Sequence, residues 1–134
     1  MRTHVASIEI SATVDDVVAF VADAEKLPVW AIGFAKAIDR DGDGWVVATA
    51  GGERVRLHVD ADPARGVVDY VLQPAPGVDV TAATRAVATP GGAVYTFVMV
   101  QAPGMSEETF DAQIAELGRE LTVLKAHLET ACTL

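Results

Sequence analysis

Polar and apolar residues alternate along the start of the chain. The even-numbered residues from His4 to Ile10 fall on one face, and Val5, Ser7 and Glu9 fall on the other. A period of two residues is typical of a strand. We therefore predict a strand over residues 3–10 with one predominantly apolar face.

Helical spacing replaces this alternation after residue 11. Either Ser11 or Thr13 can cap a helix, and valines then recur from Val14 at positions i, i+3, i+4 and i+7. This pattern predicts an amphipathic helix of about ten residues. Pro28 prevents a long helix in the segment that follows, so we expect a short helix or a turn around Trp30.

From about residue 34 to residue 102 the pattern is one of strands and tight turns. Clusters of glycine, proline and aspartate, such as residues 41–44, separate the apolar segments. Sequential strands joined by such short connections form an antiparallel meander. The predicted strands are residues 34–39, 44–50, 53–60, 66–73, 78–88 and 93–101.

The last predicted element is a helix of more than 20 residues that begins at Ser106, a residue suited to an N-cap. Its apolar residues recur at spacings of 4, 3, 4, 3 and 4 and form one stripe. Only about three heptads fit, so packing on the sheet is favoured over a coiled coil. The stripe consists of Phe110, Ile114, Leu117, Leu121, Leu124 and Leu128, and we assign Asp111, Glu116, Arg119, Glu120 and Lys125 to the opposite face.

This order of elements predicts a single α+β domain over residues 1–134. Together with residues 8–23, 27–30 and 117–129, it resembles the START-like superfamily, also called SRPBCC. That superfamily includes polyketide cyclase/dehydrase-like proteins, lipid-transfer proteins and Hsp90-activator homologues. The resemblance implies a helix-grip fold, in which a curved antiparallel sheet of six or seven strands surrounds a long C-terminal helix and leaves a cavity. It carries no shared catalytic motif, because such folds host many activities.

Composition narrows the choice of partner. The 134 residues carry a net charge of −9, which disfavours nucleic acid, and their basic residues form no patch for an anionic membrane. No apolar stretch is long enough for a membrane span or a secretory leader. Cys132 is the only cysteine, which excludes an intrachain disulfide and a multi-cysteine zinc site. We expect a soluble cytoplasmic protein without a cofactor.

The strand faces suggest which side chains line the cavity. Tyr70 shares a face with Val68 and Leu72, so we expect its phenol to point inward and to need a hydrogen-bond partner. Gly118 flanks the helical stripe; we interpret it as allowing a strand to approach closely, with a wider cavity as the alternative. The predicted ligand-binding residues are Trp30, Phe34, Leu57, Tyr70, Val80, Tyr95, Phe97, Ile114, Leu117 and Leu121.

Three functions remain open. The first is binding of a small hydrophobic or aromatic ligand, such as a lipid, a steroid or a polyketide-like molecule. The second is a polyketide cyclase/dehydrase-like enzyme, whose general acid or base would be sought among His58, Asp23 and Tyr70. Alternation places His58 beside Arg56 on the solvated face of its strand, unless the register is reversed. The third is a protein-interaction module like the Hsp90-activator homologues, whose interior would be filled by its own side chains.

Two further patterns concern metals and self-association. Asp39, Asp41, Asp43 and Gly44 match the first half of an EF-hand loop, but its twelfth position is Ala50 instead of glutamate. We therefore predict a hairpin turn here and no metal site. The segment 93–100 is apolar on both faces, so Val94, Val98 and Val100 make the outer sheet face a candidate homodimer surface.

Overall fold

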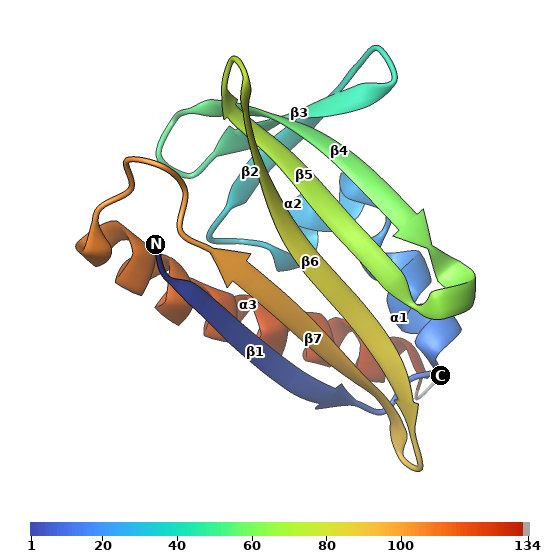
Figure 1. The fold of residues 1–134 in the computed structure, drawn as a ribbon. Helices are drawn as coiled ribbons and strands as arrows, with labels where there is room; N and C mark the ends of the chain where they lie inside the picture. Colours follow the sequence, from blue (N-terminus) through green and yellow to red (C-terminus); the bar gives the residue numbers. More distant parts are fainter. Residues whose placement is uncertain (133–134) are drawn as a thin grey trace.

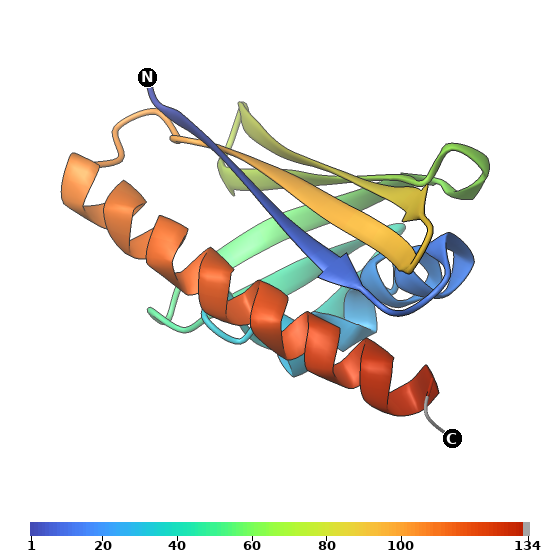
Figure 2. The same ribbon diagram turned by 90° about the horizontal axis from the view of Figure 1, so that it is seen from below.

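The computed structural model describes residues 1–132. Seven antiparallel strands form one curved sheet, and the long helix α3 runs across one of its faces (Figures 1 and 2). The strand order is β1-β7-β6-β5-β4-β3-β2, so the first strand pairs with the last. The elements are β1 (Thr3–Ile10), α1 (Val14–Val21), η1 (Ala24–Lys26), α2 (Leu27–Trp30), β2 (Ala35–Asp41), β3 (Gly44–Thr49), β4 (Arg54–Asp62), η2 (Pro63–Arg65), β5 (Val67–Ala75), β6 (Val78–Thr89), β7 (Gly92–Val100) and α3 (Glu107–Cys132).

This architecture confirms the predicted α+β helix-grip fold, and each predicted strand is present with bounds shifted by two residues or fewer. Thr13, not Ser11, caps α1, because its hydroxyl accepts a hydrogen bond from the Asp16 amide at 3.1 Å. The Ser106 hydroxyl likewise accepts from the Thr109 amide at 3.1 Å, where α3 begins. Pro28 lies in the first turn of the short helix α2.

The core lies between the inner sheet face and the three α-helices. In β4, Val55 and Leu57 are buried, whereas Arg56 and His58 are exposed, as the alternation predicted. Helix α3 packs chiefly on β1 and on α2. Its stripe is buried at five positions and half-buried at Ile114. The helix therefore covers one edge of the sheet most closely.

The segment rich in aspartate is the hairpin between β2 and β3, as predicted. Asp41 pairs with Gly44, and Gly42 between them has a φ of +61°, which glycine adopts without strain. The Asp41 carboxylate accepts a hydrogen bond from the Arg56 guanidinium at 2.8 Å. Within residues 1–132, no three His, Cys, Asp or Glu side chains are grouped so as to hold a metal ion.

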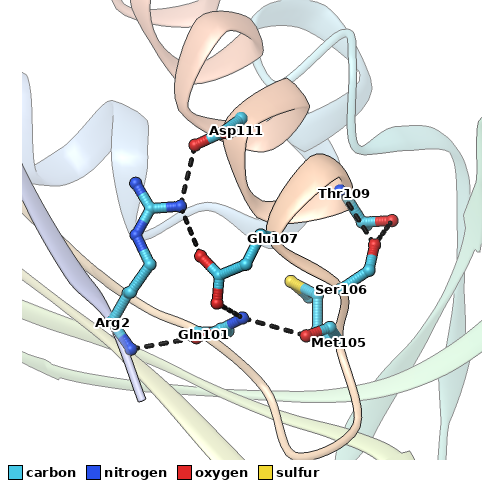
Figure 3. Close-up of polar contacts among 7 residues, drawn as sticks. All are labelled: Arg2, Gln101, Met105, Ser106, Glu107, Thr109 and Asp111. Carbon is cyan, nitrogen blue, oxygen red and sulfur yellow. Dashed lines mark hydrogen bonds and ion pairs between the residues drawn. The ribbon is translucent and has the colours of Figure 1, made fainter.

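The start of α3 is tied to the first and last strands by a polar cluster (Figure 3). The Arg2 guanidinium lies 2.8 Å from both the Glu107 and the Asp111 carboxylates, and it stacks over the Phe110 ring at 5.0 Å. The buried Gln101 side chain accepts from the Arg2 amide and donates to Glu107. These contacts join the start of α3 to the residues that flank β1 and β7.

The outer sheet face carries apolar side chains on the neighbours of β7 as well as on β7 itself. Val94, Val98 and Val100 are half-buried by their neighbours, while Val5 and Val87 are 58% and 44% exposed. The homodimer through this face stays a prediction.

Candidate functional site

The structure brings most of the predicted ligand-binding residues together between the sheet and the helices. Six of them are buried and belong to one hydrophobic cluster: Trp30, Leu57, Tyr70, Tyr95, Leu117 and Leu121. Phe34 and Phe97 are partly buried and pack against that cluster. Val80 and Ile114 are half-buried, but they are not packed against it.

Partly buried apolar residues mark where the hydrophobic cluster meets solvent. Trp45, Leu72 and Val80 lie on the inner face at one end of β3, β5 and β6, where Trp45 pairs with Leu57, Leu57 with Leu72, and Leu72 with Val80. Phe34, in the segment that joins α2 to β2, is also half-buried. These side chains form a partly solvated apolar rim beside the buried cluster.

Four polar side chains meet inside this apolar cluster. Tyr70 on β5 donates its hydroxyl to the Val21 carbonyl, and Thr84 on β6 donates to the Val68 carbonyl at 2.7 Å. The other two, Trp30 on α2 and Tyr95 on β7, pack their rings edge to face with centroids 6.5 Å apart. The cluster therefore draws on three adjacent strands and the short helix.

Two of these polar groups have no hydrogen-bond partner. The Trp30 indole nitrogen and the Tyr95 hydroxyl are both buried and unpaired, and they are the only side-chain atoms of this kind in the described residues. The hydroxyls of Tyr70 and Thr84 lie close enough to the Tyr95 hydroxyl to lower its pKa as hydrogen-bonding neighbours do, but neither meets the full geometry of a hydrogen bond with it. An unpaired buried donor costs about 1–3 kcal/mol. Both groups could donate to an acceptor that entered the cluster.

Burial keeps both phenols neutral. Desolvation raises the pKa of Tyr95, and it raises the pKa of Tyr70 well above its ordinary value. A neutral phenol donates a hydrogen bond but does not accept a proton near neutral pH. Tyr70, one of the three predicted acid/base candidates, is further engaged by its bond to the Val21 carbonyl.

The other two acid/base candidates lie outside this cluster. His58 is exposed on the outer face of β4. Asp23 is exposed as well, and its carboxylate caps η1 by accepting from the Glu25 amide at 3.1 Å. The structure therefore does not bring His58, Asp23 and Tyr70 together.

A buried carboxylate on α3 was assigned to the wrong face by the sequence analysis. Glu120 is only 7% exposed, although we placed it among the solvated residues of α3. It follows Leu117 by three residues and precedes Leu124 by four, so helical geometry already placed it beside the stripe. Its Oε2 accepts from the amides of Gly33 and Phe34, each at 3.1 Å. Burial raises the pKa of Glu120 to about 7.

The interpretation of Gly118 was also wrong. Gly118 is exposed, and a Cβ added there would meet no side chain and no neighbouring element within 4 Å. It neither admits a strand nor widens the site, because this side of α3 faces solvent.

The two best-formed hollows among the described residues lie on the surface. One lies beside Arg56, His58 and Gln73 on β4 and β5. The other lies where β1 ends, beside Pro90 and Lys125. The inner space is instead occupied by side chains of the hydrophobic cluster, so a ligand between helix and sheet requires some of them to move.

The geometry defines a helix-grip protein with an apolar interior and two unpaired donors. Comparison with known proteins shows which structures share this fold. No family model and no curated protein matches the sequence. Among solved structures, protein XoxI from Bacillus cereus superposes with a TM-score of 0.73 at 14% identity, over 96% of each chain.

Two other similar structures come from biosynthetic loci. The di-domain ARO/CYC StfQ of the steffimycin biosynthetic pathway gives a TM-score of 0.68 at 15% identity, over 98% of this chain and 52% of StfQ. DynU16 of the dynemicin biosynthetic locus gives 0.71 at 18% identity, over 96% of this chain and 48% of DynU16. The chain therefore shares its fold, a curved antiparallel sheet with a long C-terminal helix, with these proteins. No helix within residues 1–132 is both long and apolar enough to cross a membrane.

Proposed function

We propose that this protein binds a small apolar molecule, with at least one hydrogen-bond-accepting oxygen, between α3 and the inner face of the sheet. The observation that carries the proposal is the pair of buried donors without acceptors, the Trp30 N–H and the Tyr95 O–H. A carbonyl or hydroxyl oxygen of a lipid, a steroid or a polyketide-like molecule would satisfy them. The surrounding side chains are apolar or aromatic, as ligand sites commonly are.

Two contributions would drive binding. Apolar contact supplies about 25 cal/mol for each Å² removed from water, before the costs of association. Pairing an unsatisfied donor removes a penalty of about 1–3 kcal/mol. The first contribution is shared by any apolar molecule of suitable size, whereas the second selects molecules that carry an oxygen.

The alternative is a cyclase-like enzyme, which the likeness to StfQ supports at the level of the fold alone. Two donors in a dry site could stabilise an enolate, but proton removal also needs a nearby base. Glu120 has the pKa for such a role, yet its carboxylate is held by the Gly33 and Phe34 amides. Among the described residues no unengaged base lies beside Tyr95, which favours binding without turnover.

A protein-interaction role is the third possibility, and the filled interior is the observation in its favour. It makes a different prediction, because a closed interior would neither retain a small molecule during purification nor respond to one. Native mass spectrometry of freshly purified protein, followed by denaturing extraction, tests this point first. A co-purified neutral lipid, steroid or aromatic ketone would support the binding proposal.

A matched pair of probes tests the oxygen directly. 2-Acetonaphthone and 2-ethylnaphthalene have nearly the same shape, but only the ketone offers an acceptor. Binding is followed by Trp30 fluorescence in a Trp45→Phe background, since the chain has only two tryptophans. We expect the ketone to bind about tenfold more tightly, and Tyr95→Phe to weaken that preference, because the Trp30 N–H remains as a donor.

Control variants separate the site from general effects. Tyr70→Phe should keep the preference for the ketone, because the Tyr70 hydroxyl already has a protein acceptor. His58→Ala on the outer face should change nothing. Equal affinity for the two probes in the parent protein would contradict the role of the unpaired donors. Failure of both probes and an empty purified protein would favour the interaction role.

A further inference from the structure

One basic side chain lies on the inner face of the sheet, at the edge that β2 forms (Figure 1). Arg40 on β2 pairs in register with Trp45 on β3, which pairs with the buried Leu57 on β4. Residues paired across an antiparallel sheet point to the same face, so Arg40 lies beside the apolar rim. Among the paired positions of this sheet within residues 1–132, Arg40 is the one lysine, arginine, aspartate or glutamate on that face.

The Arg40 guanidinium is stacked on an aromatic ring and has no ion pair. Its Cζ lies 4.8 Å from the centre of the Trp45 ring, and its Nε donates to the Gly42 carbonyl at 3.3 Å. No carboxylate of residues 1–132 lies within ion-pair distance of it. The adjacent Asp41 carboxylate is engaged by Arg56 at 2.8 Å. The two terminal nitrogens of Arg40 can therefore donate to a bound molecule.

This arrangement suits an anion at the rim. A guanidinium that stacks on an aromatic ring uses its flat face, which leaves the N–H groups along its edge for hydrogen bonds. Two parallel N–H groups match the two oxygens of a carboxylate. Because Arg40 is exposed, such an anion stays in contact with water and avoids the large cost of burying a charge. The rim can therefore accept an acidic group that the interior cannot.

The separation between this rim and the interior sets the shape of the ligand. Trp30, which carries one unpaired donor, ends α2, and the chain then enters β2 at the buried Ala35. Ala35 and Arg40 are five residues apart on that strand. At about 3.3 Å per residue this corresponds to roughly 16 Å. A molecule that contacts both Arg40 and the unpaired donors is therefore elongated.

We propose that Arg40 is a specificity-determining residue that binds the carboxylate of an elongated acid at the rim, while the apolar body of the acid extends inward to the Trp30 and Tyr95 donors. This inference rests on the proposed function and narrows its ligand class. The ligand carries a neutral oxygen at its inner end and an acidic group at its outer end. The apolar rim beside Arg40 supplies contact for the body of the ligand.

A matched pair of probes tests the acidic group. 5-(6-Acetyl-2-naphthyl)pentanoic acid and its primary amide have nearly the same shape and share the ketone, but only the acid is charged near neutral pH. Isothermal titration calorimetry measures the affinity of the parent protein for each. We expect the acid to bind about threefold to fivefold more tightly than the amide. Salt at about 0.5 M should remove most of this preference, because the charged pair is exposed to water.

Substitutions of two exposed arginines separate the site from the net charge. Arg40→Gln should make the acid and the amide bind equally and leave the affinity for the amide nearly unchanged. Arg54→Gln makes the same change of charge on the outer face of β4, where Arg54 is exposed and has no ion pair, so the preference for the acid should persist. Arg40→Lys should keep part of the preference, since lysine retains the charge without the planar fork.

The failure of this inference is distinguishable from the failure of the proposed function. Equal affinity for acid and amide in the parent protein would refute the role of Arg40 but leave the donor site intact. A preference for the acid that survives in Arg40→Gln, or that disappears equally in Arg54→Gln, would also overturn it. If 2-acetonaphthone binds and neither long probe does, the elongated acid is excluded. If none of the three binds, the proposed function fails as well.

Discussion

Replacing Tyr95 by phenylalanine should stabilise the ligand-free protein. The Tyr95 ring is fully buried, and its hydroxyl has no hydrogen-bond partner. Unfolding returns that hydroxyl to water, so its desolvation counts against the folded state. Phenylalanine keeps the ring and its edge-to-face contact with Trp30 but removes the hydroxyl. We expect the free energy of unfolding to rise by about 1–2 kcal/mol.

Tyr70 supplies the matched comparison on a nearby strand. Its ring is also buried, but its hydroxyl donates to the carbonyl of Val21, the last residue of α1. Carbonyls at the end of a helix lack partners within the helix, so Tyr70→Phe leaves this one unpaired inside the core. We expect a loss of about 1–2 kcal/mol. The same chemical change should therefore have opposite signs at the two tyrosines.

Urea denaturation followed by far-UV circular dichroism measures both effects. Because the exposed surface hardly changes, the denaturant slope should stay constant and only the midpoint should move. The two variants should differ by about 2–4 kcal/mol. Equal destabilisation by the two substitutions would show that the Tyr95 hydroxyl is satisfied within the protein. The main argument for an acceptor-bearing ligand would then fail.

Three other variants test separate features of the fold. Gly118→Ala should raise the free energy of unfolding by about 1 kcal/mol in urea denaturation, because Gly118 lies on an open helix surface. Gly66→Ala should lower the free energy of unfolding, because Gly66 has a φ of +69° and a Cβ there would collide with the Ala86 backbone. In the parent protein, the free energy of unfolding should fall by roughly 3 kcal/mol as pH rises from 4.5 to above 7, because an acid with a raised pKa binds its proton more tightly in the folded state. Glu120→Gln should remove this pH dependence. Arg2→Ala should lower the melting temperature by an amount that shrinks in about 1 M salt, since its ion pairs are exposed.

The fold could be predicted because local signals agreed with one another. In β4, Leu57 points inward and His58 points outward. Because short hairpins join the strands, this alternation also predicts which side chains of the neighbouring strands point inward. The same logic placed Tyr70 and Tyr95 in the interior. Register errors would have required a bulge between these strands, and the irregularities lie elsewhere, in β2 and near the end of β5.

The flanks of the α3 stripe could not be assigned in the same way. Glu120 and Gly118 both border the stripe, and a helix repeat alone does not say which border is covered. Packing of α2 and the following segment on α3 decides it, and that contact joins residues almost 90 positions apart. The Glu120 carboxylate is buried where it accepts hydrogen bonds from the backbone amides of Gly33 and Phe34. A pattern of side chains along the sequence does not predict contacts with backbone amides.

Sequence patterns also do not predict which buried polar groups find a hydrogen-bond partner. The groups without a partner are what give the proposed site its selectivity. Tyr70 finds the Val21 carbonyl 49 positions away, while Tyr95 and Trp30 find nothing. Both unpaired groups can donate a hydrogen bond, and the Trp30 N–H can only donate, so the pair favours a ligand that carries an acceptor. No cation in the described residues is buried beside them to balance an anionic ligand, and Glu120 adds negative charge to the interior when ionised. Since burying an uncompensated charge costs far more than pairing one neutral oxygen, a ketone or an ether should be preferred over the corresponding carboxylate of the same size.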